Sequence, residues 1–204
     1  RFLTFELETL TRGKPTFISC GNHDQMTKNN SNIWQMGCRS LLKEVLKPLP
    51  NVTVLEDSEK QNIGEVSISA FSPAYSYYEL EKESEEAYLD EFMKEMDYDL
   101  FNSEEYNILL THAPESIINL FKKQISLLKT NPDLVVSGHM HNGLIPLFKN
   151  AGLFSPSREL FPKYAHGVLE EGETSFVING AVNTRVESPT INSFFKPSAN
   201  IITL

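Results

Sequence analysis

The chain has 204 residues, 40% of them hydrophobic, and carries 18 lysines and arginines against 27 aspartates and glutamates. This composition is ordinary for one globular domain, so we expect a single domain over residues 1–204. A net charge of −9 gives nucleic acid little to bind, because duplex binding depends on basic side chains that neutralise phosphates. No apolar run approaches the roughly 18 residues of a transmembrane helix. Two cysteines are too few for a disulfide scaffold.

The first predicted elements are a helix and a strand. Apolar positions from Phe2 to Leu10 predict a short helix before Gly13. Residues 14–20 predict a buried strand, which ends in the polar quartet at residues 21–24, Gly-Asn-His-Asp. Open α/β sheets usually bind ligands at the carboxyl ends of their strands, so this quartet is a candidate site.

The next segment combines a helix, a hairpin and an acidic stretch. Residues 33–47 predict a helix closed by Pro48, and the β-branched runs 51–55 and 66–71 are typical of a hairpin. Ten acids then face two lysines between residues 79 and 99. We interpret residues 75–105 as an acidic insertion containing a helix with a solvated outer face. A lid over the site and a partner surface are the alternatives.

The second half again alternates strands and helices. Residues 108–110 and 134–136 predict buried strands, separated by an amphipathic helix at 117–128. The remainder is rich in loops, with strands predicted at 176–178 and 201–204. Strands alternating with helices indicate a layered α/β fold.

Three of the five histidines directly follow buried apolar runs: His112, His139 and His141. Neutral imidazole is the commonest metal ligand in proteins, and strand ends hold side chains in fixed positions. In an extended segment 139–141, both imidazoles would project to the same side and could bind one metal or two adjacent metals. These positions together favour a metal site over three separate structural histidines.

The quartet at 21–24, His112 and the segment Gly138-His139-Met140-His141 resemble, in order and spacing, the last three motif blocks of the calcineurin-like metallophosphoesterases. The resemblance extends over residues 15–204 outside the acidic insertion. Residues 161–167 and the C-terminal run 201–204 look like a bacterial branch of small membrane-associated or secreted phosphoesterases. The resemblance implies an α/β fold of the four-layer α/β/β/α sandwich type and a hydrolase acting on phosphoric ester bonds.

The resemblance also implies roles for individual residues. His23 would lie beside the scissile phosphate and assist the leaving oxygen, with Asp24 orienting its ring. Four residues would bind metal, with Asn22, His112 and His139 on the second ion and His141 on the first. Two divalent cations would polarise the phosphoryl oxygens and activate a bridging water. Such ligands suit manganese, iron or zinc, and we favour manganese.

Two motif blocks of the family, Asp-x-His and Gly-Asp-x-x-Asp, do not occur in this sequence. They supply the remaining ligands of the first metal and the carboxylate that bridges both metals. Because the sequence also starts at Arg1 without a methionine, we expect the C-terminal part of a longer enzyme that lacks the first strands of its sheet. Alone, it is expected to bind the second metal weakly and to be inactive. An anchor upstream would make the protein membrane-associated; otherwise it would be cytoplasmic.

Several functions stay open on the sequence alone. The expected substrate is a phosphodiester or phosphomonoester of a small molecule or a lipid head group. The alternative is a non-catalytic regulatory or binding module that retains a remnant metal site, and the acidic balance disfavours a nuclease. The oligomeric state is open, although an incomplete sheet would expose a strand edge able to pair with another chain.

Weaker candidates surround this site. Cys20 precedes the quartet on a buried strand and is expected to be a core residue. Six further side chains could contact substrate, although packing is the preferred interpretation for the tyrosines: Tyr75, Tyr77, Tyr78, Arg158, His166 and Arg185.

Overall fold

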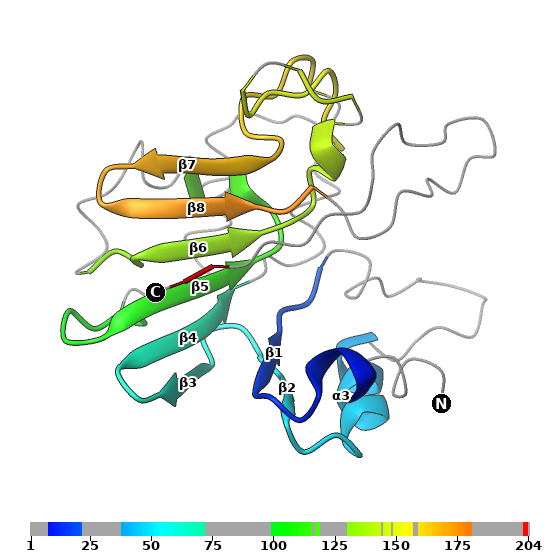
Figure 1. Cartoon of the computed structure of the whole chain (residues 1–204), viewed down its shortest axis with the longest axis vertical. Coiled ribbons are helices and arrows are strands. Elements are labelled where there is room, and N and C mark those ends of the chain that lie inside the picture. Colours follow the sequence, from blue (N-terminus) through cyan, green and yellow to red (C-terminus); the bar gives the residue numbers. More distant parts are fainter. Residues whose placement is uncertain are drawn as a thin grey trace.

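Short β-branched and apolar runs form two separate sheets in this chain, one of two strands and one of six (Figure 1). The structure is a computed structural model that describes residues 8–21, 38–71, 99–115, 117–118, 130–143, 145–147, 149–156, 159–180 and 202–203. The strands are β1 (Thr16–Ile18), β2 (Val52–Val54), β3 (Lys60–Ile63), β4 (Val66–Phe71), β5 (Tyr106–Thr111), β6 (Leu134–Ser137), β7 (Gly167–Glu171) and β8 (Thr174–Ile178). The helical elements with assigned bounds are α3 (Cys38–Leu46) and the 3-10 turn η2 (His141–Gly143). The fold is therefore mixed α/β.

The six-stranded sheet has the order β3-β4-β5-β6-β8-β7. Its four central strands run parallel, and β3 and β7 pair antiparallel with their neighbours at the two edges. The register places Leu110 opposite Val136 and Ser137 opposite Ile178. Strands β5, β6 and β8 therefore end at one edge of the sheet, which brings the residues after each strand into one neighbourhood.

The main core lies on one face of this sheet. Leu109, Val135 and Phe176 are direct cross-strand neighbours on β5, β6 and β8, and each side chain is fully buried. Burying such side chains stabilises the fold by about 1.5–3 kcal/mol each. Further buried members of this core come from β4 and from chain segments that cover the sheet: Phe71, Leu100, Phe101, Ile117 and Ile118.

The start of β5 is fixed by a buried amide. The side chain of Asn107 is 1% exposed and donates to the carbonyls of Asn102 and Glu105, at 2.6 and 2.8 Å. Its backbone N–H donates to a carboxylate oxygen of Asp133 at 2.7 Å. Because Asp133 directly precedes β6, these bonds align the two strands whose far ends carry His112 and His139.

The smaller sheet has its own core. Strand β1 pairs parallel with β2, and α3 packs on them to bury Cys20, Leu46, Leu49 and Val54. Figure 1 shows α3 beside these two strands. Cys20 is 1% exposed, which confirms its interpretation as a core residue.

The predicted hairpin of 51–55 with 66–71 is wrong. Strand β2 pairs with β1, and the hairpin partner of β4 is β3, which the sequence analysis did not identify. All four residues of β3 are exposed, and its sequence Lys-Gln-Asn-Ile carries no apolar alternation. An edge strand held by backbone pairing alone leaves little signal in a hydrophobicity pattern.

The C-terminal half differs in two further places. Strand β7 was not predicted, although Gly172, with φ +65°, forms the turn between β7 and β8. Residues 202–203, expected in a strand, are in none, and Ile202 is 41% exposed. A β-branched run favours a strand only where a neighbouring strand is available to pair.

The described residues include only parts of the predicted helices. Residues 8–11 are helical, α3 accounts for the later part of the helix expected at 33–47, and 117–118 are helical within the one expected at 117–128. The helix expected in the acidic insertion lies outside the described residues. Within the described ranges, no helix is long and apolar enough to span a membrane.

Candidate metal centre

Two of the predicted histidines meet at the carboxyl ends of β5 and β6. The parallel pairing continues past the strands, because the N–H of Gly138 donates to the carbonyl of His112 at 3.2 Å. On the other side, the N–H of Asn179 donates to the carbonyl of Ser137 at 2.8 Å. These bonds fix the backbone of Ser137 and Gly138, directly before His139, to the neighbouring chain segments on both sides of β6.

The rings of His112 and His139 are in direct contact. Nε2 of His112 lies 3.0 Å from Nδ1 of His139, and the ring planes meet at 64° with centroids 4.7 Å apart. Two nitrogens about 2.05 Å from one metal would lie about 2.9 Å apart at a right angle and about 3.3 Å apart at the tetrahedral angle, a range that includes 3.0 Å. The two nitrogens therefore fit as adjacent ligands of one divalent cation. In the absence of a cation, one nitrogen is protonated and donates to the other.

A carboxyl group lies on the far side of His139. Oε1 of Glu115 is 4.0 Å from Nε2 of His139, whose side chain is 7% exposed. A carboxylate near one ring nitrogen favours the proton on that nitrogen, which leaves Nδ1 of His139 for the side that faces His112. Glu115 is thus placed to set the tautomer of His139, at a distance longer than a hydrogen bond.

Burial, chiefly, and the nearby charge of Glu159 together raise the pKa of Glu115 to about 7, against the lowering effect of its backbone hydrogen bond. Its Oε2 is buried and has no hydrogen-bond partner within the described residues. Glu115 was not among the residues predicted from the sequence. The available signal was an acidic residue three positions after His112 and two positions before the predicted helix.

Gly21 lies against the face of His112. A Cβ atom built on Gly21 would come within 2.8 Å of Cε1 and of Nδ1 of His112. Only a residue without a side chain fits there, because Cβ contacts under 3.0 Å require a neighbour to move. The first residue of the Gly-Asn-His-Asp quartet therefore contacts His112, from a different sheet and more than ninety positions earlier in the chain.

The segment 139–141 is not extended, contrary to expectation. His139, His141 and Asn142 have φ angles of 63°, 48° and 55°, in the left-handed region, while Met140 between them is 3% exposed. The two imidazoles therefore do not alternate as in a strand. Left-handed backbone in three non-glycine residues is costly and is concentrated at functional sites.

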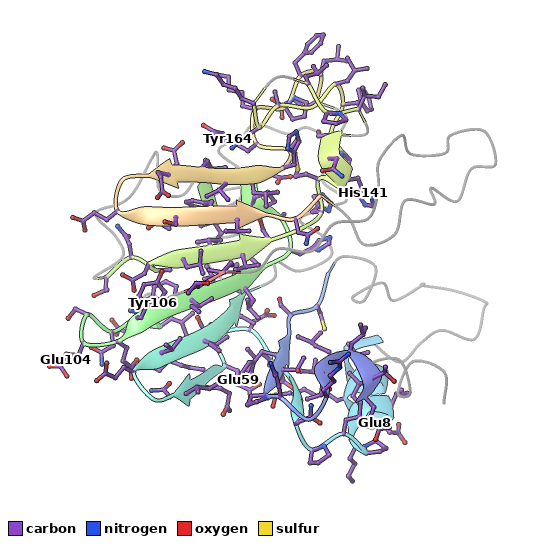
Figure 2. All side chains as sticks on the ribbon, viewed as in Figure 1. Glu8, Glu59, Glu104, Tyr106, His141 and Tyr164 are labelled. Carbon is purple, nitrogen blue, oxygen red and sulfur yellow. The ribbon has the colours of Figure 1, made fainter. Side chains whose placement is uncertain are left out.

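Close packing holds this strained segment. A Cβ on Gly180 would collide with the side chain of Asn142, and a Cβ on Gly143 would collide with the Cα of Gly152. These two contacts join η2 to the chain after β8 and to the loop after residue 151. His141 lies at the start of η2 and is exposed (Figure 2).

The strand ends carry further buried polar atoms. The hydroxyl oxygens of Thr111 and Ser137, the last residues of β5 and β6, are buried without a hydrogen-bond partner in the described part of the chain. Unpaired buried hydroxyls are uncommon in protein interiors. These two hydroxyls therefore add polar atoms to the sheet edge beside the histidine pair, and packing of the core does not explain them.

The rest of the predicted site is not brought together by the described residues. Among them, no three His, Cys, Asp or Glu side chains form a group that could hold a metal ion, so His141 does not join the pair in such a group. His166 is half-buried, and its Nε2 has no hydrogen-bond partner among the residues that the structure describes. Most of the acidic insertion and the following candidates lie outside the described residues: Asn22, His23, Asp24, Tyr75, Tyr77, Tyr78, Arg158 and Arg185.

Comparison with known proteins gives one result. A family model described as calcineurin-like phosphoesterase matches residues 1–143. This range includes the quartet at 21–24, His112, His139 and His141, and it stops before the loops that precede β7. No curated protein and no solved structure shows a significant match to the chain.

Proposed function

The chain belongs to the calcineurin-like phosphoesterase family, and from this premise we propose that it hydrolyses a phosphodiester or phosphomonoester of a small molecule or a lipid head group through a dinuclear metal centre. The family consists of phosphoester hydrolases that generally use divalent metals. The observation that supports the proposal most is the 3.0 Å approach of Nε2 of His112 to Nδ1 of His139 at the shared edge of β5 and β6.

The second metal is assigned to Asn22, His112 and His139. The two imidazoles have the spacing of adjacent ligands. The contact of Gly21 with His112 supports Asn22 as the third ligand, because Asn22 is the next residue in the chain. Nitrogen and amide-oxygen ligands add no negative charge beside an anionic substrate. His141 is assigned to the first metal, and manganese is favoured over iron and zinc.

The proton transfer is assigned to His23 and Asp24. His23 directly follows Asn22, so a substrate phosphate held by the proposed metals would come near its ring. Its proposed role is to give a proton to the leaving oxygen, and Asp24 holds the ring in the required orientation. When bound, the metals supply charge stabilisation at the phosphoryl oxygens. Glu115 positions His139 and does not contact the substrate.

The finer architecture is also part of the proposal. The two sheets correspond to the two inner layers of an α/β/β/α sandwich, with residues 1–204 in one domain. A parallel sheet of only two strands is unusual, because parallel strands normally occur in larger sheets covered on both faces. Strand β1 is therefore the position at which further strands of the sandwich would pair.

A non-catalytic binding module is the second candidate. Two observations favour it: the sequence lacks the Asp-x-His and Gly-Asp-x-x-Asp blocks, and the described residues contain no group of three metal-binding side chains. On this account the histidine pair stabilises the fold with at most one weakly held metal.

One experiment separates the two functions. The product of the complete reading frame is assayed for metal content and for hydrolysis of bis(p-nitrophenyl) phosphate with added manganese, with and without chelator. The hydrolase account predicts nearly two metals per chain and turnover that the chelator abolishes. His23→Ala should lower that turnover at least a hundredfold, as expected for loss of a general acid, while Glu104→Gln, at the other end of β5 from His112, should leave it nearly unchanged. No turnover would favour the module, and turnover that the chelator leaves intact would contradict the dinuclear metal centre.

The 204-residue chain alone gives a second test. With only His141 available for the first metal, it should show turnover far below that of the complete product. Equal rates in the two proteins would contradict the ligand assignment, because the absent blocks would then be dispensable.

A further inference from the structure

The loops between η2 and β7, together with the first two residues of β7, form a small protruding structure, which we call the 145–168 excursion. Three short stretches lie side by side in it, since the N–H of Leu153 donates to the carbonyl of Ile145 at 2.8 Å and the N–H of Phe161 donates to the carbonyl of Leu153 at 3.0 Å. Figure 1 shows these loops standing out beyond β7 at one end of the molecule. The excursion is therefore an ordered structure with its own hydrogen bonds.

Exposed apolar side chains are concentrated on the excursion. Nine large hydrophobic residues are exposed among the described residues, and five of them lie within its 24 positions. They are Ile145 (40% exposed), Leu147 (36%), Leu160 (63%), Phe161 (58%) and Val168 (60%). Single exposed apolar residues are common on soluble proteins, but such a concentration in one ordered loop structure indicates a surface that contacts an apolar phase or partner.

Phe161 is held exposed by a strained backbone. Its φ angle is 58°, in the left-handed region that bulky side chains rarely adopt. Its N–H bond to Leu153 fixes the residue in this conformation. Strained residues persist where the surrounding structure holds them, and here the surrounding structure presents an aromatic ring to solvent.

A cavity whose lining includes two lysines lies between these loops and β7. It has a volume of about 340 Å³ and is lined by Lys149, Asn150, Ala151, Lys163, Tyr164 and Leu169. Within the described residues, no ion pair joins either lysine to an acid. The hydroxyl of Tyr164 lies 3.1 Å from a carboxylate oxygen of Glu171 and donates to it. Figure 2 places Tyr164 toward the same end of the molecule as His141, far from Glu8 and Glu59.

The charge of the excursion is opposite to that of the rest of the chain. Residues 145–168 contain three basic residues and one acidic residue, a net charge of +2, so the other residues sum to −11. An anionic surface would attract this end and repel the remainder, which would orient the molecule as it approaches.

We propose that the 145–168 excursion docks on an anionic phospholipid bilayer. Leu160, Phe161 and their exposed neighbours enter the boundary between head groups and acyl chains, while Lys149 and Lys163 bind lipid phosphates from the cavity. A second copy of the chain fits the surface less well, because a symmetric dimer would place the lysines of both copies together. The proposal does not depend on hydrolysis, and the family match ends before the excursion begins.

The test is co-sedimentation of the purified chain with vesicles made from equal parts of phosphatidylcholine and phosphatidylglycerol. Binding should be at least tenfold stronger to these vesicles than to pure phosphatidylcholine, and it should weaken as salt is raised. The double variant Leu160→Ser/Phe161→Ser should lower binding at least tenfold, because both side chains lose their apolar burial. The double variant Lys149→Gln/Lys163→Gln should lose the preference for anionic vesicles.

The matched control is Ile63→Ser, which removes a comparably exposed side chain from the edge strand β3 and should leave binding unchanged. Four results would overturn the proposal. The first two are no binding to anionic vesicles and an equal loss of binding in Ile63→Ser. The third is light scattering that shows a dimer dispersed by Leu160→Ser/Phe161→Ser, which would assign the surface to a second copy. The fourth is binding of inorganic phosphate without any binding to vesicles, which would make the cavity a simple anion site.

Discussion

At the scale of single residues, the candidate centre depends on a few side chains that hold one another in place. The ring of His112 is bounded by Gly21 on one face and by His139 at its Nε2 edge. Glu115 lies on the other side of His139. Each neighbour limits the orientation of an imidazole, so substitutions beside the rings should alter metal binding without removing a ligand.

Gly21→Ala is predicted to displace the ring of His112, because the new Cβ would lie 2.8 Å from two of its ring atoms. We expect manganese affinity to fall about tenfold or more, as for loss of a neighbour that orients a ligand, measured by isothermal titration calorimetry. The matched control is Gly138→Ala, beside His139, where a Cβ meets no atom within 4 Å. Equal losses in both variants would contradict the packing role of Gly21.

Glu115→Gln is predicted to weaken metal binding about tenfold, the lower end of the range for a group that orients a histidine ligand. The amide keeps the size of the side chain but removes the charge that favours a proton on Nε2 of His139. The same calorimetric titration measures the effect. Glu104→Gln is the control, because that carboxylate lies at the other end of β5 (Figure 2). An unchanged manganese affinity in Glu115→Gln would contradict the role of Glu115 in orienting His139.

At the scale of elements, the parallel arrangement of β5, β6 and β8 brings together residues that are far apart in the sequence. The strained turn η2 follows β6 and is packed against the 145–168 excursion through Gly143 and Gly152. The close approach of these two glycines joins the candidate metal centre to the proposed docking surface.

Two glycines allow this contact to be tested. Gly143 and Gly172 share the same φ of +65°, but a Cβ meets atoms only at Gly143. Gly172→Ala should cost about 1 kcal/mol of unfolding free energy, the backbone penalty alone. Gly143→Ala should cost about 1–3 kcal/mol more, because the added methyl group forces the two segments apart. Urea denaturation measures both values, and equal costs would show that the contact carries no packing energy.

The strands with apolar signals could be predicted from the sequence, and those without could not. Leu109, Val135 and Phe176 mark β5, β6 and β8 because a buried parallel strand needs apolar residues. Strand β3 is polar and exposed, so nothing in its composition distinguishes it from a loop. The wrong hairpin prediction has the same cause, because β4 was paired with the nearest β-branched run, residues 51–55, once β3 had not been recognised.

The candidate site, too, could be predicted from the sequence only in part. Strand-end placement agrees with the observed approach of His112 to His139, because the carboxyl ends of parallel strands share an edge, while the assignment of both rings to one metal stays a prediction. It could not predict the left-handed backbone of His139 and His141, which depends on contacts with distant residues such as Gly180. Glu115 was missed for a related reason, because its relation to His139 exists only in the folded chain.

At the scale of the whole molecule, the distribution of charge separates the possible partners. The net charge of −9 opposes binding to polyanions, while the excursion alone carries +2. A long duplex would have to contact acidic surface on either side of any basic patch, whereas a flat bilayer can be met by one end of the molecule.

We therefore predict no binding to duplex DNA. In a gel-shift assay at low salt, where electrostatic binding is strongest, the chain should not retard a duplex at micromolar concentrations. A salt-sensitive shift would contradict this prediction and would return the nuclease to consideration. Anionic vesicles at the same salt concentration are the positive control for the 145–168 excursion.

The measurement that tests the central claim most directly is a manganese titration followed by electron paramagnetic resonance, in which bound ions lose the signal of free ions. The account predicts one weakly bound manganese per 204-residue chain. His112→Ala and His139→Ala should each abolish it, and His166→Ala should preserve it. Binding that survives the loss of either ring, or no binding by the unaltered chain, would contradict the claim that His112 and His139 together hold a metal ion.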